Sequence, residues 1–197
     1  WGGWKIFRTS FAKVHRVGNS AALAFCGTVS MCQIIMEIYK KILSRLKSRT
    51  GGELPQLNQV KLLLRIMRAF ASAYGDAGAT FIYAGLDLKT HKGIILELGS
   101  DGSYFKPDRH HLALGSGMVE ADTVLEGYFD KLNDQKKTTE RVAVKLALNA
   151  IRRASKDMGV GDPRTQSATI ALIDAETGFS YLDQKKVQKI IAREVTK

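Results

Sequence analysis

Hydrophobic residues recur along this chain with two periods, and the changes between them divide it into elements. Between Met31 and Leu46, apolar side chains recur every three or four residues, which predicts an amphipathic helix that ends at Gly51. A similar spacing predicts a second helix between Pro55, a residue favoured in the first turn, and Gly75. The sequence therefore predicts two consecutive helices, each with one apolar face.

Segments of strand-like composition lie on both sides of this helix pair. They cover residues 5–9, 20–27, 79–86, 93–98, 103–106 and 111–114. Turn residues separate them: Gly18 and Asn19 lie between the first two, and Gly99 to Gly102 lie inside the later group. We expect the segments after the helix pair to form an antiparallel meander.

The last part of the chain returns to helices and then to strands. Helices are predicted after Gly117, as far as Leu132, and over residues 139–156. Strands are predicted over 168–173 and 179–182, and Asp183 is placed to cap a final helix. The order ββ αα ββββ αα ββ α predicts an α+β fold in which two antiparallel sheets lie between layers of helices.

Composition narrows the class of protein. The chain has 197 residues, 45% hydrophobic residues and 3 prolines, as expected of one globular domain over residues 1–197. Cys26 and Cys32 are too few for a disulfide framework, so we expect a reducing cytoplasm. No apolar run approaches the ~18 to 20 residues of a membrane span. His110 and His111 have no carboxylate or cysteine at a ligating spacing, so we predict no metal site.

The net charge of +11 raises nucleic-acid binding as one hypothesis. Basic residues gather on the first and last predicted helices: Lys40, Lys41, Arg45, Lys47, Arg49, Lys185, Lys186, Lys189 and Arg193. Glu37 and Glu194 share those helices, and the sequence contains no nucleic-acid-binding motif. Solvated helix faces, or contacts to acidic neighbouring subunits, are therefore favoured over nucleic acid.

A series of short segments resembles, in order, the subunits of the 20S proteasome family, which are N-terminal-nucleophile hydrolases. The segments are Lys5-Ile-Phe, Ala24-Phe-Cys-Gly-Thr-Val29, Tyr83-Ala-Gly-Leu-Asp87, Gly99 to Gly102, Leu112-Ala-Leu-Gly-Ser-Gly117 and Leu125-Glu-x-Tyr128. The resemblance implies a four-layer αββα sandwich. It also implies seven-membered rings of proteasome-type subunits, stacked with α-type rings around a chamber that degrades unfolded proteins. The run from Cys26 to Gln33 favours a β-type over an α-type subunit.

For a catalytic β-type subunit the resemblance implies a threonine-type endopeptidase that uses no cofactor. The nucleophile is an N-terminal threonine whose own α-amine accepts the hydroxyl proton. By the motif match, Lys5 and Asp157 tune that amine and Ser116 hydrogen-bonds to it. The Gly27 N–H stabilises the oxyanion, a contribution of about 3 to 4 kcal/mol. The alternatives are a structural Lys5, a Ser116 that caps the third helix and a solvated Asp157.

The same match implies that Phe25, Val29 and Gln33 line the pocket for the residue before the scissile bond. A bulky Phe25 at the base would make that pocket shallow and apolar, so small or medium apolar side chains are the expected preference. The alternative is that Phe25 and Val29 belong to the hydrophobic core.

The chain also departs from the family pattern. In the family, two strands that carry the threonine and a further aspartate precede the Lys5 segment, and here the sequence starts at Trp1. Either those strands precede Trp1 in the natural protein, which the start at Trp1 favours, or the chain is an inactive structural ring subunit. Val160 stands where a serine is usual, and residues 10–19 are interpreted as an insertion without a counterpart.

Overall fold

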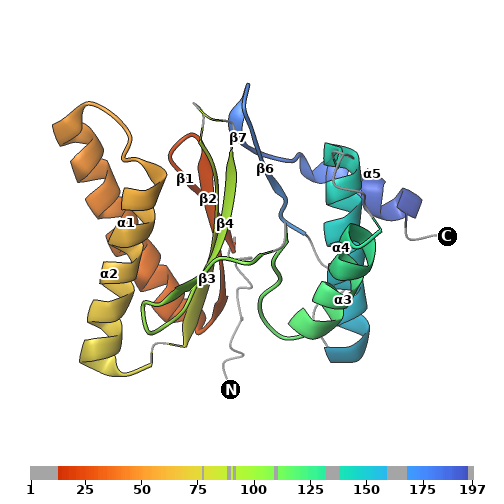
Figure 1. The fold of residues 1–197 in the computed structure, drawn as a ribbon, viewed down its shortest axis with the longest axis horizontal. Coiled ribbons are helices and arrows are strands. Elements are labelled where there is room, and N and C mark those ends of the chain that lie inside the picture. Colours follow the sequence, from red (N-terminus) through yellow and green to blue (C-terminus); the bar gives the residue numbers. More distant parts are fainter. Residues whose placement is uncertain are drawn as a thin grey trace, which may run out of the picture.

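The computed structural model describes residues 13–76, 78–87, 90, 92–108, 111–131, 138–158 and 168–194. The elements are β1 (Val14–Val17), β2 (Ala21–Gly27), α1 (Val29–Thr50), α2 (Gln56–Tyr74), β3 (Ala79–Leu86), β4 (Gly93–Leu98), β5 (Tyr104–Phe105), α3 (Met118–Phe129), α4 (Glu140–Met158), β6 (Ala171–Asp174), β7 (Gly178–Tyr181) and α5 (Gln184–Glu194). The helix pair, the larger sheet, the smaller sheet and the remaining helices follow one another across the molecule (Figure 1). The predicted αββα arrangement of two antiparallel sheets between helices is confirmed.

The larger sheet buries one face against α1 and α2. Within the described residues its strand order is β1-β2-β3-β4-β5, and every neighbouring pair is antiparallel. Leu23 lies opposite Tyr83, and Tyr83 lies opposite Leu96, so the three form one row of the core. Side chains alternate between the two faces of a strand. The odd-numbered buried positions of β2 and β3 therefore point toward the helix pair.

The two helices match that face with apolar stripes of helical period. On α1 the buried side chains include Cys32, Ile35 and Tyr39, which recur three and four residues apart. The helix ends where Gly51 adopts a left-handed φ of 69° and donates its N–H to the Lys47 carbonyl, 3.0 Å away. The predicted end at this glycine is confirmed, because a left-handed residue stops the helical ladder at little cost only when it lacks a Cβ.

The smaller sheet joins the C-terminal helices to the larger sheet. Val144 and Leu148 of α4 pack with Val187 and Ile191 of α5, and residues of the β6 segment pack against this cluster. On the other side, the Tyr181 hydroxyl donates to the Val14 carbonyl at 3.0 Å. The Phe179 N–H likewise donates to the Asn19 carbonyl at 2.7 Å. These bonds fix the smaller sheet against β1 and the β1–β2 turn.

Two predictions about strands are wrong. Residues 111–114 form no strand, and β5 is reduced to Tyr104–Phe105, because Pro107 follows it without an N–H to donate. Residues 10–19, interpreted as an insertion without a counterpart, include β1 (Val14–Val17), which pairs with β2. The predicted strand over 5–9 lies outside the described residues. Among the described helices, none has both the length and the apolar character needed to cross a membrane.

Candidate functional site

Gly27 ends β2 in a position that excludes every other residue. Its φ of +102° lies in the left-handed region, and a β-carbon built there would stand 1.8 Å from the carbonyl oxygen of Gly78. That oxygen also accepts the N–H of Thr28 at 2.8 Å, so it cannot move away without losing this bond. The close approach of the two backbones thus explains the glycine.

The N–H of Gly27 points away from β3. On the β1 side the Phe25 N–H donates to the Lys13 carbonyl at 3.2 Å, and on the β3 side the Thr28 N–H donates to Gly78. In an antiparallel ladder, successive residues direct their N–H groups to opposite sides. Odd-numbered residues of β2 therefore face β1, and the Gly27 N–H emerges on that side. The Gly27 N–H is therefore not used in pairing with β3.

The Gly115-Ser116-Gly117 loop lies beside the end of β2. A β-carbon on Gly115 would lie 3.6 Å from Cβ of Cys26, the residue before Gly27. On the other flank, a β-carbon on Gly117 would lie 2.7 Å from Cβ of Ala154 in α4. The loop thus lies between β2 and α4. A methyl group added at Gly117 would be too close to α4.

This contact brings Ser116 to the β2 end and to the part of α4 that carries Asp157. Ser116 is exposed, and α3 has Gly117 at its N-cap without a side-chain capping bond, so the alternative capping role of Ser116 is wrong. Asp157 lies three residues beyond Ala154, which is almost one turn along the same helix. Its side chain lies outside the described residues.

Lys5 also lies outside the described residues, and another lysine occupies the β1 side of the site. Lys13 directly precedes β1 and pairs with Phe25, two residues before Gly27. Burial raises the pKa of the Cys32 thiol to about 11, with a further increase from Cys26, whereas the positive charge of Lys13 partly opposes this shift. Lys13 is therefore within electrostatic reach of α1's first turns.

Sequence reasoning missed Lys13. The available signal was a lysine followed by two valines three residues apart, just before the Gly18–Asn19 turn. Its meaning depends on pairing with β2, which the local pattern does not show.

The three expected pocket residues occupy two different environments. Phe25 is only 6% exposed and belongs to the core, where its ring centroid lies 5.7 Å from His15 and 6.1 Å from Phe81. Val29 is 37% exposed, and Gln33, one turn later on α1, is half-buried. Val29 and Gln33 thus share a helix face that begins just after Gly27. Their contact with substrate, like that of Phe25, stays a prediction.

The sequence model of the proteasome subunit family matches residues 3–170. The chain belongs to the proteasome subunit family. No curated protein matches it significantly. Subunits of this family assemble with one another in rings, and the family includes threonine peptidases. Membership therefore associates the chain with protein degradation, while the type of subunit is a separate question.

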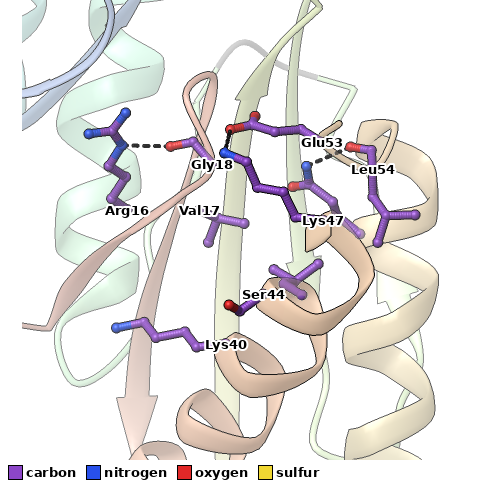
Figure 2. Close-up of a pocket in the computed structure, with 10 residues that line it drawn as sticks. Arg16, Val17, Gly18, Lys40, Ser44, Lys47, Glu53 and Leu54 are labelled. Atoms are coloured by element: carbon purple, nitrogen blue, oxygen red, sulfur yellow. Dashed lines mark hydrogen bonds and ion pairs between the residues drawn. The ribbon is translucent and has the colours of Figure 1, made fainter. Parts of the chain in front are cut away.

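This proteasome-family chain also has a cavity at the other end of β2. Val17, one of its lining residues, pairs with Ala21, which lies six residue steps, about 20 Å, from Gly27 along β2. The cavity volume is about 240 Å³, and its described lining comes from β1, the β1–β2 turn, α1, the loop before α2 and Gln59 of α2 (Figure 2). In the described part of the chain, no group of three or more His, Cys, Asp or Glu side chains is placed to hold a metal ion.

Glu53 connects α1 to the β1–β2 turn at this cavity. Its carboxylate pairs with Lys47 Nζ at 3.2 Å (Figure 2). It also accepts the backbone N–H of Asn19 at 3.0 Å. Gly18 turns the chain with a φ of +63°, and a β-carbon there would lie 2.5 Å from Glu53 Oε2. The glycine thus allows the carboxylate to approach the turn.

Proposed function

We propose that this chain is a catalytic β-type subunit, a threonine-type endopeptidase that cleaves unfolded proteins inside a ring-shaped chamber. One observation carries the proposal: the Gly27 N–H, the Ser116 loop and the α4 segment bearing Asp157 converge at one end of β2. The proposed setting is a seven-membered ring of proteasome-type subunits, stacked against an α-type ring in the cytoplasm.

The proposed reaction requires a threonine with a free α-amine at this end of β2. Its hydroxyl attacks the peptide carbonyl, the amine takes the hydroxyl proton, and the Gly27 N–H donates to the oxyanion that forms. Collapse of this intermediate releases the amine product and leaves an ester, which water then hydrolyses. Ser116 and Asp157 are the proposed hydrogen-bonding partners of the amine.

A lysine beside that amine would keep it neutral and ready to accept a proton, because a like charge disfavours protonation. The motif match assigns this role to Lys5. The position of Lys13, opposite Phe25 and near Cys26 and Cys32, supports Lys13 as the better candidate. The two lysines lie on the same N-terminal segment and serve as matched variants.

The test is hydrolysis of fluorogenic peptides by the full-length gene product, together with N-terminal sequencing and native mass measurement. Lys13→Ala should lower kcat by about 100-fold or more, as expected for loss of a group that controls proton transfer. Lys5→Ala should change kcat by less than about twofold, and both variants should still form rings. Equal activity of Lys13→Ala and the wild type would refute the role of Lys13.

The other hypotheses give different results in the same experiment. Rings that have no N-terminal threonine and do not hydrolyse peptides would identify a structural subunit. A monomer whose binding to DNA weakens steeply with salt would identify a basic nucleic-acid-binding module.

A further inference from the structure

The cavity at the β1–β2 turn has an excess of positive charge. Among its described lining residues, Arg16, Lys40 and Lys47 are cationic, and Glu53 is the one carboxylate. Glu53 is already bound to Lys47 and to the Asn19 N–H. The cavity therefore contains more positive charge than its own carboxylate neutralises.

The other two cations contact neutral groups. The Arg16 guanidinium donates to the Gly18 carbonyl at 2.6 Å and to the Asn19 side-chain oxygen, and it lies 5.9 Å from the ring centroid of Phe179 in the smaller sheet. Arg16 therefore points to the face of β1 opposite to Lys40, which leaves Lys40 as the cation available to an occupant of the cavity. Lys40 Nζ lies 3.3 Å from Nδ1 of His15, whose pKa is lowered by burial and by the Lys40 charge, so that ring is neutral at neutral pH. Within the described part of the chain, no carboxylate pairs with Arg16 or Lys40.

Polar and apolar groups line the cavity together. Lys40, Ser44 and Lys47 lie four and three residues apart on α1, so they follow one face of the helix beside the cavity (Figure 2). Val17 is 3% exposed, and Leu43 and Leu54, both half-buried, add further apolar surface. An occupant that uses both kinds of surface carries a negative group and a short hydrocarbon part.

Size and polarity identify the class of occupant. A volume of about 240 Å³ corresponds to roughly eight water molecules at about 30 Å³ each. Inorganic phosphate has no apolar part to cover Val17 and Leu43, whereas a carboxylic acid of about four to six carbons has one. The combination of Lys40 with the apolar surface thus favours an aliphatic carboxylate.

We infer that this cavity binds a small aliphatic monocarboxylate, with the carboxylate toward Lys40 and the hydrocarbon chain against Val17 and Leu43. The same chemistry is offered by a free short-chain acid and by the carboxyl-terminal residue of a peptide. The inference does not depend on the proposed peptidase activity, because the cavity lies at the opposite end of β2.

Calorimetric titration of the purified full-length protein tests this inference. Hexanoate should bind saturably, with a dissociation constant of about 1 mM for so small a ligand. Hexanol and inorganic phosphate should bind much more weakly, since hexanol lacks the carboxylate and phosphate lacks the hydrocarbon chain. Lys40→Met keeps the length of the side chain without its charge and should weaken hexanoate binding by up to about fivefold.

The matched control is Lys41→Met, which removes the charge of an exposed neighbour on α1 that does not line the cavity. Its affinity for hexanoate should equal that of the wild type. The inference would be overturned by equal losses of hexanoate affinity in Lys40→Met and Lys41→Met. It would also be overturned if phosphate or hexanol bound as tightly as hexanoate, or if hexanoate showed no saturable binding.

A further titration distinguishes a free short-chain acid from a peptide carboxyl terminus as the source of the carboxylate. It compares a short peptide ending in leucine with a free carboxyl group and the same peptide as an amide. Binding of the free-acid peptide alone, lost in Lys40→Met, identifies a peptide carboxyl terminus as a ligand. Binding of hexanoate without either peptide identifies a free acid.

Discussion

The side chain of Gln59 lies inside the core and depends on its hydrogen bonds. It is 4% exposed, and its Nε2 donates to the Leu54 carbonyl at 2.8 Å. Its Oε1 accepts the hydroxyl of Tyr83 at 3.0 Å, and its backbone carbonyl accepts the hydroxyl of Tyr39 at 3.2 Å. Burial raises the pKa of Tyr83, so the phenol stays protonated and donates. This network connects β3, α1 and α2.

Tyr83→Phe removes one donor and leaves Gln59 Oε1 buried without it. An unsatisfied buried polar group costs about 1 to 3 kcal/mol. For a chain of this size, each kcal/mol lowers Tm by roughly 2 to 4 °C. Gln59→Leu instead leaves the Tyr83 hydroxyl without its acceptor. In the double variant neither group is stranded, so the combined loss should be smaller than the sum by about 1 kcal/mol or more.

Urea unfolding of the four proteins measures these free energies, with an unchanged m-value as the sign that the same transition is compared. Tyr74→Phe is the matched control, because Tyr74 is 75% exposed and its replacement should change stability by less than about 0.5 kcal/mol. The reasoning fails if Tyr83→Phe behaves like Tyr74→Phe, or if the two core substitutions add without coupling.

Two further predictions concern pH and backbone conformation. Burial, and then the Lys40 charge, lowers the pKa of His15 below 6.5, so the unfolded chain binds this proton more readily than the folded chain. Stability should fall as pH drops below about 6.5, and His15→Gln should flatten that slope in urea unfolding; an unchanged slope would contradict the assignment. Gly117→Ala should cost at least about 1 to 2 kcal/mol, because φ is +79° and the new methyl group would meet Ala154. Gly127→Ala, in open space on α3, should stabilise by up to about 1 kcal/mol, and the opposite order in thermal unfolding would refute this reasoning.

The spacing of apolar residues predicted the helices and strands in which that spacing is regular. The two long helices follow the spacing of their apolar residues, and β3 and β4 have the predicted bounds of 79–86 and 93–98. The Asp183 cap of α5 is confirmed, since its carboxylate accepts the Lys185 N–H at 2.9 Å. The β1 segment has no clear strand pattern, because His15 and Arg16 interrupt its apolar residues. It is stabilised as a strand by pairing with β2.

The sequence by itself determined the helices, most of the strands, the apolar faces and a resemblance that pointed to Gly27, because periodicity and short motifs are properties of neighbouring residues. Tertiary structure decided which groups meet. Only strand pairing directs the Gly27 N–H to the β1 side and brings Lys13 close to Phe25. Only the contact with α4 positions the Ser116 loop. Burial against the helix pair likewise places Phe25 in the core. These outcomes depend on contacts between residues far apart in the chain, which no local pattern encodes.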